Sequence, residues 1–473
     1  MAFVTTFATA KRTKIVCTIG PVSSSPAVLE AMVREGMDVA RLNFSHGTRE
    51  EHARVARAVH GISEKVGKPV AVLGDLAGPR IRVGRMKEGA ALAADSTVVV
   101  TGRDVIGDTG LIPVSYPGLA KDVKPGDAIL LADGTIELRV ESTRGDEIEC
   151  RVVVGGPLAS RKGVNVPART LSLPSLTGKD REDVRFAVES GFDLIAVSFV
   201  QAPEDVEAVR GVSAKAGRAV PIVAKIERQG ALDNLEAILR SANGAMVARG
   251  DLGVEIPLAR VPEVQKRIIR LANRLARPVI TATQMLESMV ENPRPTRAEA
   301  TDVYNAILDG TDAVMLSEET AIGRHPVEAV RVLAAIAKEA EASLVARPPE
   351  ASEIAGDVKA AVGRAAVDLA RDVGAVAIVT PTSTGRTPRA IARHRPPLPI
   401  LALSSDPHVV RSLALVWGVF PVSTPGSLSI DDLIVKAREL LRADGVPTGR
   451  PIVLTMGYPQ GKGLTNMVLV VES

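Results

Sequence analysis

The chain has 473 residues, which at roughly 150 residues per domain predicts about three domains. Its residues are 46% hydrophobic and 24% charged, as in an ordinary globular protein, but only 2% are aromatic. The formal net charge is +3, no dense Lys/Arg block is present and few rings are available to stack on bases, so we expect no nucleic-acid partner.

The first residues lack the apolar core and cleavage site of a signal peptide, and no apolar run in the chain is long enough to span a membrane. The two cysteines, Cys17 and Cys150, stand far apart, as expected of reduced thiols. We therefore expect a cytoplasmic protein without a membrane partner.

Short Val/Ile/Leu-rich runs alternate with amphipathic stretches in the first part of the chain, which is the βαβ pattern of a parallel sheet. The predicted strands are Lys14–Gly20, Val39–Phe44 and Val70–Leu76, with helices from Ala27 to Arg34 and from Glu50 to Val66. From about Gly84 to Asn165 the pattern changes to short alternating runs and turn residues. We expect antiparallel strands there at Ala128–Leu131, Ile136–Ser142 and Glu147–Val154, with turns at Asp133-Gly134 and Gly145-Asp146.

After this β-rich insertion, five more strands are predicted: Asp193–Phe199, Ile222–Glu227, Ala245–Arg249, Pro278–Thr283 and Ala313–Ser317. Three strands before the insertion and five after it make the eight of a closed (β/α)8 barrel, the TIM-barrel fold. An open doubly wound sheet is the alternative.

The segment ARPPEASE reads as a linker to a C-terminal α/β domain. Its expected strands are Val376–Thr380, Ile400–Leu403, Pro451–Met456 and Val468–Val471. The predicted fold class is therefore α/β: a TIM barrel (residues 1–83 and 165–345), an inserted small β-barrel lid (84–164) and a C-terminal α/β regulatory domain (346–473).

Polar residues follow the predicted barrel strands at their carboxyl ends, where catalytic groups of such barrels lie. In PIVAKIE, Lys225 and Glu227 share one face of an otherwise apolar strand, and Asp251 follows the next strand. Buried charges are costly unless they are paired or bind an ion. A structural ion pair is the simpler interpretation, but two carboxylates on neighbouring strands favour a site for Mg²⁺ or Mn²⁺.

Other groups near the predicted barrel mouth suit a polyanionic substrate. Gly250 and Gly253 permit a tight turn whose amides can hold a carboxylate or phosphate. Arg41, Asn43 and Arg82 add cationic and polar groups on the side nearest the insertion. Phosphoryl transfer requires such positive charge around the moving group.

A set of motifs then resembles the pyruvate kinase family, in the family's order from Lys11 to about Ala346. The motifs are TKIVCTIGP, ARLNFSHG, RKGVNVP, LPSLTGKD, AKIE, MVARGDLGVE, TATQMLESM, PTRAEATDV and DGTDAVMLSEETAIGRHPVEAV. The segments TSTGRTPRAIARHRP and PQGKGLTN are similar to the family's C-terminal domain.

The resemblance implies phosphoryl transfer from phosphoenolpyruvate to ADP, giving pyruvate and ATP in the last step of glycolysis. It implies that Glu227 and Asp251 hold the divalent metal and that Lys225 steadies the phosphoryl group. Arg41 would contact the substrate phosphate, and the substrate carboxylate would be held by the backbone at Gly250 and Asp251 and by the Thr283 hydroxyl. Because a hydroxyl is a weak acid, we expect a water relay near Thr283 to protonate the enolate.

The family's nucleotide contacts correspond to Asn43, His46, Arg82 and Lys162, with Lys162 on a lid that excludes water when it closes. A homotetramer is the expected assembly. Lys68 stands where many members carry an arginine that helps to hold the nucleotide.

Potassium-dependent members bind the ion near positions that match Asn43, Ser45, Asp75 and the carbonyl of residue 76. Here Leu76 and Arg80 replace the threonine and the acidic residue common in the family, a combination typical of potassium-independent members. We expect the Arg80 guanidinium to substitute for potassium; the alternative is a solvated Arg80 and a bound ion.

Two further features are less defined by the sequence. The loop Thr382-Ser383-Thr384-Gly385 precedes a helix, where the family binds sugar-phosphate effectors, so we expect a phosphorylated effector or else an unused helix cap. Glu318 replaces a common glycine and has no assigned role.

Two alternative functions remain open from the sequence. An aldolase that uses a metal-bound enolate would share the carboxylate pair without needing a nucleotide site. A catalytically dead sensor or scaffold would not need Lys225, Glu227 and Asp251 together.

Overall fold

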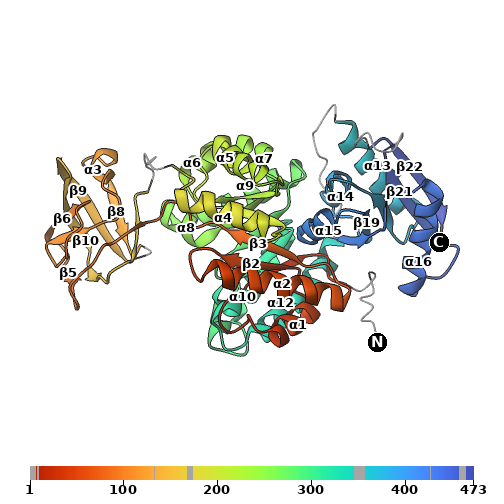
Figure 1. The fold of residues 1–473 in the computed structure, drawn as a ribbon, viewed down its shortest axis with the longest axis horizontal. Coiled ribbons are helices and arrows are strands. Elements are labelled where there is room, and N and C mark those ends of the chain that lie inside the picture. The colour runs from red at the N-terminus through yellow and green to blue at the C-terminus, as the bar shows by residue number, and fades with distance from the viewer. Residues whose placement is uncertain are drawn as a thin grey trace.

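The computed structural model describes residues 7, 10–132, 134–167, 174–345, 357–426, 428–457 and 465–473. Asp133 of one predicted turn, the ARPPEASE linker and most of PQGKGLTN lie outside these residues. Within them, the chain forms a central barrel with the β-rich insertion at one end and the C-terminal part at the other (Figure 1).

The barrel is closed by eight parallel strands in the order β1-β17-β16-β15-β14-β13-β3-β2. This closure confirms the predicted (β/α)8 barrel and excludes the open doubly wound sheet. The strands are β1 (Lys14–Thr18), β2 (Val39–Asn43), β3 (Ala71–Asp75), β13 (Leu194–Val197), β14 (Ile222–Ile226), β15 (Gly244–Ala248), β16 (Val279–Ala282) and β17 (Ala313–Leu316).

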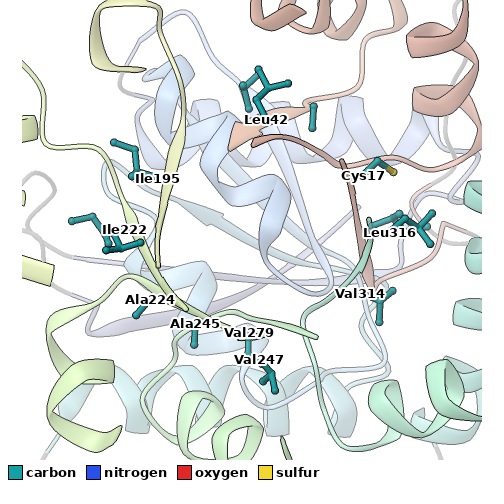
Figure 2. Packing of buried hydrophobic residues seen from close by; sticks show 14 of the residues in the cluster. Cys17, Leu42, Ile195, Ile222, Ala224, Ala245, Val247, Val279, Val314 and Leu316 are labelled. Atoms are coloured by element: carbon teal, nitrogen blue, oxygen red, sulfur yellow. The ribbon is translucent and has the colours of Figure 1, made fainter. Parts of the chain in front are cut away.

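Alternate residues of each barrel strand face two separate cores. Cys17, Ile222, Ala224 and Leu316 belong to the layer between the strands and the surrounding helices (Figure 2). Val16, Val223 and Met315, one position away in sequence, fill the barrel interior instead. This period of two places Lys225 on the inner side, in register with Val223.

Helices surround the barrel as the βα pattern predicts (Figure 1). The principal ones are α1 (Pro26–Glu35), α2 (Arg49–Val66), α4 (Gly178–Glu189), α5 (Pro203–Lys215), α7 (Leu235–Ser241), α9 (Val261–Arg274), α10 (Arg297–Leu308) and α12 (Pro326–Val345). Short helical segments follow some strands: α6 (Gln229–Asp233), α8 (Arg249–Glu255), η1 (Leu258–Arg260), η2 (Glu287–Val290) and α11 (Glu318–Ala321). Capping boxes at Thr48, Thr177 and Thr296 satisfy free amides where α2, α4 and α10 begin.

The insertion forms a seven-stranded sheet in the order β4-β12-β8-β9-β10-β6-β7 around its own apolar core. Its strands are β4 (Ile81–Arg82), β6 (Thr97–Thr101), β7 (Leu111–Pro113), β8 (Ala128–Leu131), β9 (Ile136–Arg144), β10 (Glu147–Val154) and β12 (Gly163–Asn165), joined by the pair β5 (Ala91–Leu92) and β11 (Gly156–Pro157) and helix α3 (Leu119–Asp122). A bridge between Val83 and Val114 connects the two edges. The sheet therefore curls into the expected small barrel.

The C-terminal part is a five-stranded sheet in the order β20-β19-β18-β21-β22. Its elements are α13 (Val358–Asp372), β18 (Ile378–Pro381), α14 (Arg386–Ala392), β19 (Ile400–Ser404), α15 (Pro407–Ser412), η3 (Leu413–Leu415), β20 (Val419–Ser423), α16 (Ile430–Ala443), β21 (Pro451–Met456) and β22 (Met467–Glu472). β20, which contains Pro421, was not predicted from the sequence. Proline is tolerated there because β20 lies at the sheet edge and pairs only with β19.

The C-terminal part closes the amino end of the barrel. Ala414 and Leu415 of η3 join the core inside the barrel, packed with residues such as Val16 and Ala313. Lys14 donates from Nζ to the Val419 carbonyl oxygen, 2.7 Å away. The carboxyl end of the barrel is therefore the open end. No helix among the described residues has the length and apolar character needed to cross a membrane.

Candidate active site

The carboxyl ends of β2, β3 and β14 bring four charged residues together. Lys225 Nζ lies 2.7 Å from Glu227 Oε1 and 3.5 Å from Asp75 Oδ1. Arg41 Nη2 lies 2.6 Å from Asp75 Oδ2. Lys225, Glu227 and Asp75 are each at most 5% exposed. The predicted cluster of charges at the barrel mouth is therefore a compact, nearly dry network.

Two positive charges converge on Asp75. Burial raises the pKa of this carboxyl group, but Lys225 and Arg41, with a smaller effect from Arg80, outweigh burial and hold the pKa below its usual value. The Arg41 guanidinium is fixed further by a 2.8 Å hydrogen bond from Nη1 to Thr18 Oγ1. Asp75 thus fixes the positions of Arg41 and Lys225, and both cations can bind an incoming anion.

Lys225 is protonated in this environment. Burial lowers its pKa, but the negative charges of Asp75, Glu227 and Asp251 more than compensate and raise the pKa above its usual value. Nζ also donates to Ser198 Oγ at 2.7 Å. A buried ammonium with a raised pKa is suited to bind negative charge and unsuited to act as a base.

Glu227 is the least compensated of these charges. Burial, together with the negative charge of Asp251, raises its pKa in spite of Lys225. Oε2 accepts a 2.8 Å hydrogen bond from the Phe199 amide, whereas the buried Oε1 has only the Lys225 ammonium beside it, 2.7 Å away. Asp251 lies half-buried in the first turn of α8, directly after β15, as predicted.

This carboxylate pair fits a divalent cation. Hard oxygen ligands with unsatisfied negative charge are what Mg²⁺ and Mn²⁺ require. No group of three or more Asp, Glu, His or Cys residues able to hold a metal ion occurs in the described part of the chain. A cation at Glu227 and Asp251 would therefore complete its coordination with substrate oxygens and water, as Mg²⁺ commonly does.

Gly250 and Thr283 meet at the ends of β15 and β16. A Cβ atom on Gly250 would lie 2.9 Å from Thr283 Cγ2, so only glycine permits this contact. Thr283 has a φ of +74° and Gln284 a φ of +55°, which are strained for side chains other than glycine. Arg249 donates to the carbonyl oxygen of Thr283 from Nη2 at 2.6 Å and holds this turn.

The predicted nucleotide contacts lie in two groups. Asn43 and His46 are at the end of β2, where Asn43 Oδ1 accepts from the Ser45 amide at 3.1 Å. Arg82 lies in β4 and donates from Nη1 to the Arg161 carbonyl oxygen, beside the exposed Lys162. The second group therefore belongs to the β-rich insertion.

The positions predicted to replace a potassium site lie around Asp75. The Leu76 carbonyl oxygen accepts a 2.8 Å hydrogen bond from Ser198 Oγ. Ser45 is half-buried, and Arg80 is exposed but close enough for its charge to lower the pKa of Asp75. The permanent positive charge of Arg80 thus acts on Asp75, after the larger effects of Lys225 and Arg41.

The remaining sequence features lie elsewhere. Thr382 to Gly385 connects β18 to α14, and Thr382 Oγ1 accepts from the Gly385 amide at 2.8 Å. Glu318 is exposed in α11. Lys68 precedes β3 and donates to the Met37 carbonyl oxygen at the amino end of the barrel. Lys68 thus contacts the turn that follows α1 in this structure.

Several residues that order the site were missed in the sequence. Ser198 and Thr18 end β13 and β1, so their position directly after a buried strand was an available signal. Glu319 is buried and accepts hydrogen bonds from the amides of Leu286 and Ser317. Nothing in its sequence context distinguishes it from exposed Glu318.

Comparison with known proteins gives one consistent result. Residues 10–330 match the family model "Pyruvate kinase, barrel domain", and residues 360–471 match "Pyruvate kinase, alpha/beta domain". The pyruvate kinase of Mycobacterium intracellulare is 44% identical over 463 residues, covering 97% of this chain and 98% of the relative. That of Corynebacterium efficiens is 44% identical and covers 97% of each chain. That of Geobacillus stearothermophilus is 45% identical over 97% of this chain and 80% of its own length.

Proposed function

The chain belongs to the pyruvate kinase family and is thus a phosphotransferase of glycolysis, and we propose that it transfers the phosphoryl group of phosphoenolpyruvate to ADP, giving pyruvate and ATP. The observation that carries this proposal is the buried network of Lys225, Glu227 and Asp75 at the open end of the barrel. The two cations that this network fixes in place, Lys225 and Arg41, can bind a small anion where little water is present.

Cationic side chains and backbone groups of the site have different proposed roles in binding the substrate. Arg41 and Lys225, oriented by Asp75, would bind the phosphoryl group, with Lys225 steadying its charge during transfer. The α8 backbone at Gly250 and Asp251 would hold the substrate carboxylate together with the Thr283 hydroxyl. We expect water near Thr283 to deliver the proton to the enolate carbon, because the hydroxyl itself is a weak acid.

Glu227 and Asp251 would hold Mg²⁺ or Mn²⁺. The cation supplies Lewis-acid stabilisation of the negative charge that develops on the substrate oxygen. We expect a chelator to abolish turnover and added Mg²⁺ or Mn²⁺ to restore it. Glu227→Gln should weaken Mn²⁺ binding, measured by electron paramagnetic resonance without substrate; unchanged Mn²⁺ affinity would refute the assignment.

ADP would lie between the barrel and the lid. Asn43 and His46 approach from the end of β2, and Arg82 and Lys162 from the lid, so closure would bring the two groups together. Removal of water during closure protects the phosphoryl group from hydrolysis.

The proposed reaction is tested by a coupled assay for pyruvate formed from phosphoenolpyruvate and ADP. Lys225→Met should lower kcat by at least about a thousandfold, because it removes a buried charge aimed at the transferred group. Lys215→Met changes an exposed lysine of α5 and should leave kcat unchanged. Full activity in Lys225→Met, or no nucleotide-dependent turnover in the unmodified chain, would favour the aldolase or scaffold alternatives.

We further propose that potassium is not required, because Arg80 supplies positive charge at Asp75. Activity in potassium-free buffer should therefore match activity with potassium. Arg80→Glu should reduce the potassium-free rate, and added potassium should restore part of it. Loss of nearly all activity of the unmodified chain without potassium would disprove this proposal.

The remaining sequence expectations stay proposals. They are a phosphorylated effector at residues 382–385, a homotetramer and a cytoplasmic location. The proposed domain limits are residues 1–83 with 165–345, 84–164 and 346–473.

A further inference from the structure

A small cavity lies between the barrel and the C-terminal part, away from the site described above. Its enclosed space is only about 10 Å³, and it opens into a mouth that brings the total space to about 190 Å³ with open solvent counted; its lining includes Arg277, Arg389, Arg393, Asn273 and Asp312. Arg277 precedes β16 at the amino end of the barrel, whereas Arg389 and Arg393 lie on α14 and at its end. Each side of this domain junction therefore contributes cationic side chains.

Arg277 donates to the carbonyl oxygens of Leu239 and Arg240, whereas Arg389 and Arg393 are only partly hydrogen-bonded by the described residues. Arg389 Nε and Arg393 Nη2 are buried atoms without a hydrogen-bond partner there. Burial, strengthened by the charges of Arg277 and Arg386, lowers the pKa of Arg389 to about 10. Burial likewise lowers the pKa of Arg277, with further lowering by neighbouring arginines. Leaving guanidinium groups desolvated and unpaired is costly unless an anion joins them.

Asp312, the acidic residue of the cavity wall, already accepts hydrogen bonds from other groups. Asp312 Oδ1 accepts from Arg395 Nη1 at 3.0 Å and from the Trp417 amide at 3.2 Å. Its Oδ2 accepts from Arg395 Nη2 and from the Val279 amide, both at 3.1 Å. Asp357 acts on Arg393 only through its charge. Asp312 therefore compensates Arg389 only in part, through its charge, and neither carboxylate pairs with Arg277.

We propose that this cavity is a binding site for a phosphate-sized dianion, held by Arg277 from the barrel and by Arg389 and Arg393 from the C-terminal part. Guanidinium groups donate two parallel hydrogen bonds to phosphate oxygens, and the anion would lie at the open mouth of the cavity. The site is separate from the substrate site but adjoins residues 382–385, because Arg389 Nη1 lies 3.5 Å from the Thr384 carbonyl oxygen.

Binding at this junction has a mechanical consequence. An anion that contacts both sides stabilises the domain arrangement in which the three arginines converge. Because α14 begins directly after Gly385, any ligand that displaces the loop at residues 382–385 also changes the anion site, and the two affinities are linked reciprocally.

The test is calorimetric titration of the full chain with inorganic phosphate at constant ionic strength, with hydrogen exchange as a local readout. We expect saturable binding and slower exchange in α14 and in residues 273–278. Arg277→Gln and Arg393→Gln should each weaken binding by about tenfold, as expected for the loss of one charged hydrogen-bonding partner. Arg442→Gln, an exposed arginine of α16, is the matched control and should bind phosphate normally.

Methyl phosphate separates the two sources of the ligand. Equal binding of methyl phosphate would assign the site to a phosphate ester, and binding of inorganic phosphate alone would assign it to the free ion. Absence of saturable phosphate binding would overturn the proposal. It would also be overturned if both Gln variants bound phosphate normally, or if protection appeared only near Arg41 or residues 382–385. If either Arg277→Gln or Arg393→Gln fails to fold, the other variant is used for the test. Calorimetry and hydrogen exchange both report on phosphate binding and do not depend on the proposed reaction.

Discussion

At the residue scale, the site depends on how Lys225 is held. Its ammonium group contacts Glu227, Asp75 and Ser198, so two carboxylates and one hydroxyl fix its position. Ser198 Oγ in turn donates to the Leu76 carbonyl oxygen. The hydroxyl thus connects the end of β3 to the catalytic lysine of the proposed reaction.

Ser198→Ala should remove this connection without changing the charge of the site. We expect kcat to fall about tenfold, because the lysine loses one charged hydrogen bond and positional precision, while the chain remains folded. Ser198→Thr retains the hydroxyl and should recover part of the loss. Equal kcat values for the alanine variant and the unmodified chain would show that the carboxylates alone position Lys225.

At the element scale, the β16 turn is held in a strained form by its neighbours. Thr283 and Gln284 both have positive φ values, and Arg249 donates to the carbonyl oxygens of Ala282 and Thr283. Gly250 of α8 packs against the Thr283 side chain. The two elements therefore determine jointly where the Thr283 hydroxyl lies.

Gly250→Ala should displace Thr283, because the new methyl group would lie 2.9 Å from Thr283 Cγ2. We expect the KM for phosphoenolpyruvate to rise about tenfold, since misplaced contacts weaken substrate binding. Gly211→Ala in α5 is the matched control, because its Cβ atom would meet no atom within 4 Å. That substitution should raise the free energy of unfolding by about 0.5–1 kcal/mol and leave KM unchanged. An unchanged KM for Gly250→Ala would contradict the proposed role.

At the scale of the whole molecule, Asp193 joins the barrel to the C-terminal part. This fully buried carboxylate accepts from Arg411 Nε at 2.8 Å and lies 3.1 Å from His60 Nε2. Burial opposes its ionisation, but His408, His60 and Arg411 outweigh burial and hold its pKa well below the usual range. The ionised form is therefore stabilised by folding.

The sign of this shift predicts acid sensitivity. Because the folded pKa lies below the unfolded pKa, the stabilisation is present above about pH 4 and is lost as the pH falls further. Asp193→Asn should lower the free energy of unfolding near neutral pH by about 3 kcal/mol, and the difference should shrink in acid. Urea unfolding across this pH range measures both effects, with Asp431→Asn as an exposed control. A constant difference at all pH values would contradict this account.

Much of the fold and part of the site followed from sequence patterns. The eight barrel strands were found because they are short apolar runs separated by amphipathic helices, a pattern that burial on both faces requires. Lys225 and Glu227 were found because charges are conspicuous in such a run. β20 was missed because Pro421 breaks a strand pattern everywhere except at an edge.

The sequence by itself determined the fold class, the family and the charged residues of the barrel mouth, because local periodicity and motif order depend on residues near one another in the chain. Only the tertiary structure decided which of these charges are paired. It showed that Ser198 and Thr18 fix the cations of the site and that Asp193 joins two parts of the molecule. It also showed that Arg277 meets Arg389 and Arg393 across a domain junction. Such contacts connect residues from 23 positions apart, as in Thr18 and Arg41, to 218 positions apart, as in Asp193 and Arg411, and burial sets their energies.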